Sequence, residues 1–127
     1  MKTYNVPTFG TVGSRRTAVA DVELADANSN GTLGITVPAN SLLEIDHDVV
    51  EVFNSGGADD AVTVGYVGAL TAYVAGGDID ETSTGFGTKK GPYRVTTETE
   101  LYFKHVGTGA AATTGRVRLF VHVTPLG

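Results

Sequence analysis

The sequence has no cysteine, little positive charge and no long apolar stretch. Without cysteine, disulfide frameworks, thiolate zinc sites and thiol catalysis are all excluded. Nine Lys+Arg against 14 Asp+Glu give a net charge of −5, which argues against binding to nucleic acid or to a membrane surface. No apolar run approaches the roughly 20 residues that span a bilayer, and residues 1–7 lack the apolar core of a secretion signal. We therefore expect a soluble protein that is made and retained in a cytoplasm.

Glycine, threonine and valine dominate the remaining composition, with 17, 18 and 17 residues. Hydrophobic residues make up 41% of the 127 positions, a value typical of a folded chain. A chain of this length forms one domain with one core. Because valine and threonine favour strands and glycine favours tight turns, the composition predicts many short strands.

Alternation of apolar and polar side chains predicts where these strands lie. The pattern is present at residues 17–24, 32–37, 42–53, 61–67, 92–96, 100–105 and 116–124. Turns are expected at 28–31, which contains an Asn-Gly pair typical of hairpins, and at 54–60 and 107–115. The apolar phase changes within 42–53, which predicts a bulge near Asp48 and Val49, with Val50 and Val52 turned inward. Residues 69–75 are the one weak helical candidate.

Seven or eight short strands without intervening helices predict an all-β fold, an antiparallel β-sandwich or jelly roll. A barrel with a similar number of strands is the alternative, and the strand order stays open. We assign residues 17–127 to this single domain.

Residues 1–16 differ from the remainder, and we assign them to an N-terminal arm. Tyr4 and Phe9 stand among proline and glycine, and Arg15 and Arg16 end the segment. A free tail would not carry two aromatic side chains with so little charge. We expect an extended arm that docks on its own domain or on a neighbour; an ordinary first strand is the alternative. The candidate partner-binding residues are Tyr4 and Phe9, which would fill pockets, and Arg15 and Arg16, which would pair with carboxylates.

No residue pattern indicates catalysis or a metal site. In the run Asp46-His47-Asp48, alternation on a strand points both carboxylates away from the imidazole, so the three cannot converge. His105 and His122 also have structural interpretations. Alternate carboxylates at residues 78–81 could hold calcium, but the further ligands of a calcium loop are out of register, which favours a solvated loop.

The remaining catalytic motifs are equally incomplete. The glycine- and lysine-containing segment 85–91 lacks the spacing of a phosphate-binding loop, and no Gly-x-Ser-x-Gly is present. A glycosidase with paired carboxylates stays an alternative that nothing in the sequence favours. We therefore expect no enzyme, no cofactor and no metal.

Several short motifs, read together, are similar to a known family. They are the Ile-Thr-Val-Pro-Ala-Asn step at 35–40, Val-Gly-Tyr at 64–66 leading to Ala-Tyr-Val at 72–74, Gly-Asp-Ile-Asp at 77–80, Gly-Pro-Tyr at 91–93 and Arg-Val-Arg-Leu at 116–119. In this order they resemble the small jelly-roll proteins that decorate the heads of tailed bacteriophages. The likeness spans about residues 33–124.

The resemblance implies a virion component, a capsid decoration or cement protein on the outer face of the head. It implies the major capsid protein as partner, a homotrimer, and assembly in the host bacterial cytoplasm. It carries over no catalytic residue. The trimer has slight independent support from Phe120 and Val19, which are apolar, point outward on their strands and could pack between subunits.

Two other classes of function stay open. One is a low-copy tail, neck or fibre component, which would also be rich in strands and acidic. The other is a carbohydrate-binding module of the same fold, with exposed tyrosines as stacking platforms. Its candidate residues are Tyr66, Tyr73, Tyr93 and Tyr102.

Overall fold

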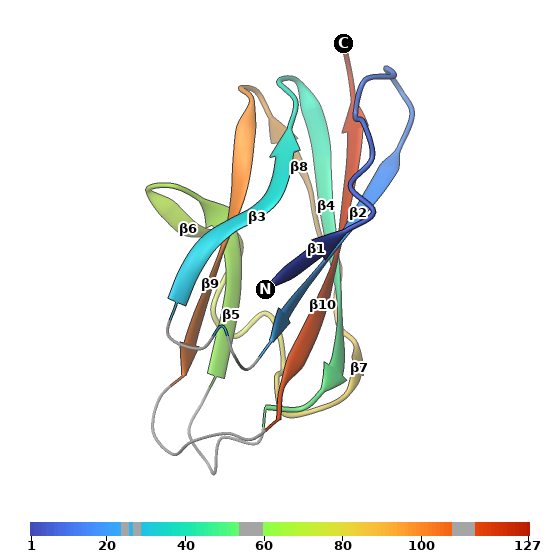
Figure 1. Cartoon of the computed structure of the whole chain (residues 1–127). Helices are drawn as coiled ribbons and strands as arrows, with labels where there is room; N and C mark the ends of the chain where they lie inside the picture. The colour runs from blue at the N-terminus through green and yellow to red at the C-terminus, as the bar shows by residue number, and fades with distance from the viewer. Residues whose placement is uncertain (24–25, 27–28, 54–59, 108–113) are drawn as a thin grey trace.

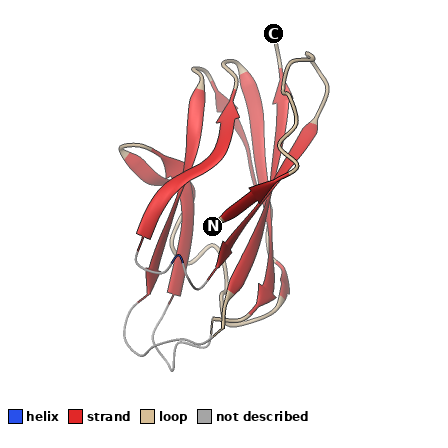
Figure 2. Ribbon diagram, in the orientation of Figure 1, coloured by secondary structure: helices blue, strands red, loops and turns tan. Residues whose placement is uncertain are grey.

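The computed structural model describes residues 1–23, 26, 29–53, 60–107 and 114–127, and strands dominate this part of the chain (Figures 1 and 2). The described residues contain no helix that is long and apolar enough to cross a membrane. The strands are β1 (Lys2–Tyr4), β2 (Arg16–Glu23), β3 (Ser29–Val37), β4 (Ser41–Glu51), β5 (Asp60–Tyr66), β6 (Ala69–Val74), β7 (Gly85–Phe86), β8 (Lys90–Val95), β9 (Thr99–Gly107) and β10 (Arg116–Pro125).

The strands form two antiparallel sheets. One has the order β1-β2-β10-β4-β7, with β8 also paired to β4, and the other has the order β3-β9-β5-β6. Four of the pairs are nested in the sequence: β2 with β10, β3 with β9, β4 with β8 and β5 with β6. This nesting across two facing sheets is the connectivity of a jelly roll. The predicted all-β sandwich is confirmed, and the two separate sheets decide against the barrel.

The core lies between the sheets and is made by the alternation that the sequence predicts. In β10 the buried side chains are Val117, Leu119, Val121 and Val123, and the intervening residues are partly exposed. The inward residues of β2, β3 and β4 follow the same rule. One face of each strand therefore packs against the opposite sheet.

Ten strands are present among the described residues, more than the seven or eight predicted. β1 comes from the arm, and β7 has only two residues, too few for a visible alternation. The helical prediction for 69–75 is wrong, because Ala69–Val74 returns from β5 as strand β6. Gly68 enables this turn, since its φ of 95° is open to glycine and strained for other residues.

Two further local predictions are corrected by the pairing of the strands. The Asn-Gly pair at 30 and 31 does not form a hairpin turn; it lies inside β3, opposite Lys104 and Phe103 of β9. The apolar phase of β4 runs unbroken to Val49, and Val50 is 40% exposed. The bulge is at Val50 itself, because β10 pairs Val117 with Val49 and then Arg116 with Glu51. The turns predicted at 54–60 and 107–115 lie mainly outside the described residues.

Candidate functional site

The arm begins as a strand of its own domain. β1 pairs with β2 in antiparallel register, with Lys2 opposite Asp21 and Tyr4 opposite Val19. The Tyr4 hydroxyl lies 3.3 Å from each carboxylate oxygen of Asp21, and the Tyr4 ring lies 5.8 Å from the guanidinium of Arg118. Arg118 in turn donates two hydrogen bonds to Asp21, at 2.9 and 3.2 Å. The arm thus covers a carboxylate that is only 4% exposed.

Beyond β1 the arm runs beside the C-terminus and then turns back into β2 (Figure 1). Phe9 is partly buried against the core, and the Gly13 amide donates to the carbonyl of Pro125 at 2.7 Å. Arg15 and Arg16 are exposed. The structure therefore holds Tyr4 and Phe9 on their own domain and leaves the two arginines at the surface; partner binding by these four residues stays a prediction.

An apolar cluster lies on the outer face of the six-stranded sheet. Phe86 stacks on Phe120 with ring centroids 5.9 Å apart, and Val19 is the β2 residue paired with Phe120. Phe86 is 71% exposed. Sequence reasoning found Phe120 and Val19 from alternation but missed Phe86, because a strand of two residues has no period. We call these three residues the phenylalanine patch.

Ion pairs surround the phenylalanine patch on the same sheet. They link neighbouring segments across the sheet. Pairs between exposed side chains stabilise a fold only weakly, whereas the Asp21 side chain in the Arg118 pair is only 5% exposed. The pairs, with their shortest distances, are Arg118–Asp21 at 2.9 Å, Arg116–Glu23 at 3.8 Å, His122–Asp46 at 2.7 Å and Lys89–Glu44 at 2.8 Å.

The three histidines occupy structural positions. His47 is buried beneath the segment that contains β7, so close that a Cβ on Gly87 would lie 2.0 Å from its Nε2. Burial lowers the pKa of the His47 imidazole. His105 packs edge-on against Phe53 at 5.0 Å, and His122 is held between Thr17 and Asp46, each at 2.7 Å. The described residues bring together no group of three or more side chains suited to a metal ion.

The acidic segment 78–81 is more firmly anchored than the predicted solvated loop. Ile79 is buried, and Glu81 is 7% exposed with a carboxylate oxygen that accepts a hydrogen bond from the Val62 amide at 3.1 Å. Asp78 pairs with Lys90 at 3.3 Å, and Asp80 accepts from the amide and hydroxyl of Thr82. The carboxylates thus point to separate partners: Glu81 accepts from a buried amide of β5, and Asp78 pairs with Lys90 of β8 in the other sheet.

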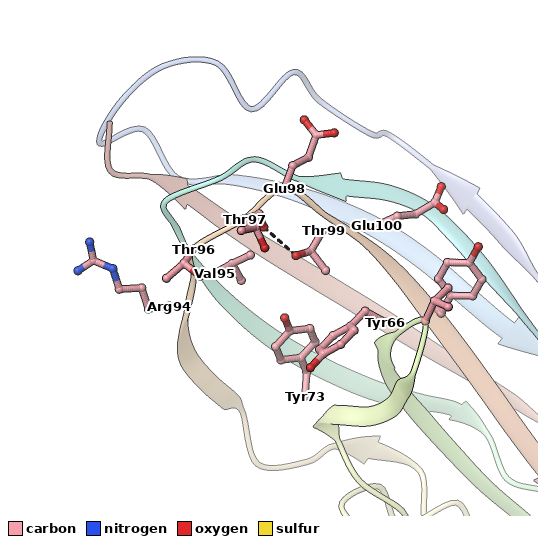
Figure 3. Close-up of a pocket in the computed structure, with 11 residues that line it drawn as sticks. Tyr66, Tyr73, Arg94, Val95, Thr96, Thr97, Glu98, Thr99 and Glu100 are labelled. Carbon is pink, nitrogen blue, oxygen red and sulfur yellow. Dashed lines mark hydrogen bonds between the residues drawn. The ribbon is translucent and has the colours of Figure 1, made fainter.

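A pocket of about 470 Å³ opens where the edge strand β6 of one sheet meets β8 of the other. Tyr66, Tyr73 and Tyr102 line it, together with residues 94–100 of the β8–β9 connection. Figure 3 shows Tyr66 and Tyr73 across from Thr97 and Thr99. The Tyr93 ring packs against that of Tyr73 in a tilted arrangement, with centroids 5.2 Å apart, and the Tyr93 hydroxyl donates a hydrogen bond to the Tyr73 carbonyl at 2.7 Å. The four candidate tyrosines, which lie on four different strands, therefore form one cluster, and we call this site the tyrosine pocket.

This chain folds as a jelly-roll sandwich, and its fold is similar to that of two solved phage capsid chains. One belongs to the cyanophage Pam1 capsid asymmetric unit; it is 16% identical, with a TM-score of 0.65 over 96% of this chain and 93% of that one. The other belongs to the acidic stable capsid structure of Helicobacter pylori bacteriophage KHP30; it is 15% identical, with a TM-score of 0.67 over 92% and 90%. No protein-family model and no curated protein matches the chain. At these identities the likeness is one of fold.

Proposed function

We propose that this protein is a structural component of a phage virion, a decoration protein bound to the outer face of the head. The observation that carries the proposal is the likeness in fold to two phage capsid chains, which extends over nearly the whole length of each. The role is one of adhesion without chemistry, and it assigns no cofactor and no metal.

The arm is the surface that we assign to the major capsid protein. Residues 1–16 contain Lys2, Arg15 and Arg16 but no aspartate or glutamate, so the arm is cationic on a protein whose net charge is −5. Val6 and Val12 add exposed apolar side chains, 46% and 62% accessible. A cationic, partly apolar segment suits an acidic partner surface, and many copies on one shell would multiply a modest affinity.

The phenylalanine patch is the surface that we assign to the homotrimer. Phe86 exposes most of an aromatic ring on the rigid face of a sheet, and aromatic side chains are enriched where subunits meet. Replacing Phe86 by serine should leave the circular dichroism of the folded protein unchanged and convert trimers to monomers in analytical ultracentrifugation. Trimers that persist in Phe86→Ser would assign the interface to another surface, and a monomeric wild type would remove it.

Quantitative mass spectrometry of purified virions tests the role itself. The protein is measured against the major capsid protein of the same particles. Hundreds of copies per particle would support a decoration protein. A dozen or so would move it to the tail, neck or fibres, and its absence from the particle would overturn the virion proposal.

Binding to heads that lack the protein tests the arm. Deletion of residues 2–12 should abolish co-sedimentation, but it also uncovers Asp21, so a charge reversal is the sharper variant. Arg15→Glu with Arg16→Glu changes two exposed side chains and should weaken binding while circular dichroism stays unchanged. Lys104→Glu, on an exposed site of the other sheet, is the control for a change of charge alone. Equal binding by the wild type, the Arg15→Glu/Arg16→Glu variant and Lys104→Glu would contradict the assignment of the arm to the capsid.

A further inference from the structure

The tyrosine pocket has the size and the lining of a small-molecule site. Its volume of about 470 Å³ lies within the range of about 300–1,000 Å³ that is typical of ligand pockets. Tyr66 is 40% exposed, so one ring wall is open to solvent. The opposite wall offers the hydroxyls of Thr96 and Thr97, and Glu98 and Glu100 carry carboxylates at the rim (Figure 3). The pocket is therefore amphipathic, with an apolar wall of tyrosine rings on one side and hydroxyls and carboxylates on the other.

The walls of the tyrosine pocket are fixed before any ligand arrives. The hydrogen bond from the Tyr93 hydroxyl to the Tyr73 carbonyl ties β8 to β6, and so joins the edges of the two sheets. The Tyr73 ring is held between Tyr93 at 5.2 Å and Tyr66 at 6.0 Å. Preorganised side chains lose little conformational entropy when they bind, which favours even a weak ligand.

The charge at the rim restricts the ligand. Glu98 and Glu100 are exposed carboxylates. Arg94, the cation among the lining residues, donates a hydrogen bond from its guanidinium to the side-chain oxygen of Asn40 at 2.8 Å. Figure 3 shows Arg94 pointing away from the tyrosines. The rim is therefore net negative, and it repels anionic ligands while it offers acceptors to hydroxyl groups.

We propose that the tyrosine pocket binds an uncharged glycan, with the apolar face of one sugar ring on Tyr66 and Tyr73 and its hydroxyls on the threonines and rim carboxylates. A sugar ring carries both kinds of surface that the pocket presents, C–H groups on its faces and hydroxyls at its edges. The site is separate from the arm and from the phenylalanine patch. The proposal therefore holds for the isolated protein, whatever its place on a particle.

Intrinsic fluorescence reports on this pocket directly. The chain has no tryptophan and five tyrosines, of which all but Tyr4 belong to the cluster. Purified protein is screened on a glycan array, and the best neutral oligosaccharide is titrated to millimolar concentration against tyrosine emission and amide chemical shifts. We expect saturable changes at residues 66, 73 and 94–102, and at least several-fold weaker binding of the uronic acid counterpart of the same sugar.

Variants at Tyr66 separate stacking from mere integrity of the fold. Tyr66→Ala should weaken binding about tenfold, because it removes the exposed ring, and Tyr66→Phe should retain most of the affinity. Glu98→Gln with Glu100→Gln should reduce the discrimination against the uronic acid, since it removes the repulsive charge. Val50→Ala, a change at an exposed β4 residue outside both the tyrosine pocket and the phenylalanine patch, is the control and should bind as the wild type does. Melting curves establish that each variant is folded.

Three outcomes would overturn the proposal. The first is the absence of any neutral glycan that binds at millimolar concentration. The second is binding that Tyr66→Ala leaves unchanged. The third is capture of a proline-rich peptide, but of no sugar, by the same tyrosines, which would make the pocket a peptide site. None of these depends on the copy number in virions, so failure here and failure of the decoration role are distinguishable.

Discussion

Gly65 is the position where one methyl group should disturb the edge of the sandwich. It lies in β5 between two pairings with β6, Val64 with Val74 and Tyr66 with Ala69, where the register shifts. A Cβ at Gly65 would lie 2.0 Å from the carbonyl oxygen of Ala69 and 2.6 Å from the carbonyl carbon of Leu70. These are backbone atoms, so no change of rotamer relieves the contact, and Gly65→Ala must push β6 away from β5.

The expected cost follows from this contact. Overpacking by a methyl group in a tight site typically costs about 1–3 kcal/mol, and a displacement of backbone belongs in the upper half of that range. For a domain of this size, about 2 kcal/mol corresponds to a fall in Tm of roughly 6–10 °C. Because Tyr66 and Tyr73 flank the displaced segment, the tyrosine emission should change as well.

Thermal unfolding followed by circular dichroism measures the effect, with Gly76→Ala as the matched control. A Cβ at Gly76 would meet only the Cβ of Ala61, at 4.0 Å, so the same substitution there is free of steric conflict. It should leave Tm unchanged or raise it slightly, since alanine restricts the unfolded chain. Equal Tm values for the two variants would refute the argument, because it rests on the different surroundings of two glycines.

Three further predictions test other parts of the structure. Burial lowers the pKa of the His47 imidazole, against the opposing effect of the Asp46 charge. The stability present above pH ~6.5 is therefore lost as the pH falls through the folded pKa. His47→Leu should reduce this loss of stability at acid pH, measured by urea unfolding. Arg118→Met should cost about 1–3 kcal/mol because Asp21 stays buried, and added Asp21→Asn should recover much of it in a double-mutant cycle. Burial raises the pKa of the Tyr73 hydroxyl. The stability present below pH ~10 is therefore lost as the pH rises through the folded pKa. Tyr73→Phe should remove this part of the loss of stability at alkaline pH, and ultraviolet titration follows the ionisation of the tyrosines.

Alternation predicted the main strands because each buries one face. In β10 every second residue from Val117 to Val123 is apolar, and each of these side chains is buried. The same periodicity identified the outward position of Phe120. Such local patterns were sufficient for the all-β class, since many half-buried strands without helices must bury their apolar faces in a sandwich or in a closed barrel.

Pairing between distant strands was beyond the reach of the same reasoning. Phe86 meets Phe120 because both β7 and β10 pair with β4, and no local spacing encodes that contact. The out-of-register calcium ligands predict a solvated loop at 78–81, but no local pattern indicates that the Glu81 carboxylate accepts from the buried Val62 amide of β5. The sequence offers the four tyrosines as candidate stacking residues, but it does not predict that they share one pocket. They come from β5, β6, β8 and β9, and only the jelly-roll crossovers bring the ends of these strands together.

The topology separates the proposed contacts in a way that makes them compatible. β1 lies at one edge of the six-stranded sheet, next to β2 and near β3, whereas β7 and β8 lie across β4 at the other edge. The tyrosine pocket opens beside β8 and β6, at the sheet edges opposite β1. A subunit held through its arm would therefore leave the pocket free to bind. If the arm variants lose capsid binding but keep glycan affinity, and Tyr66→Ala does the reverse, the two edges act independently; a joint loss in either variant would show that one surface does both.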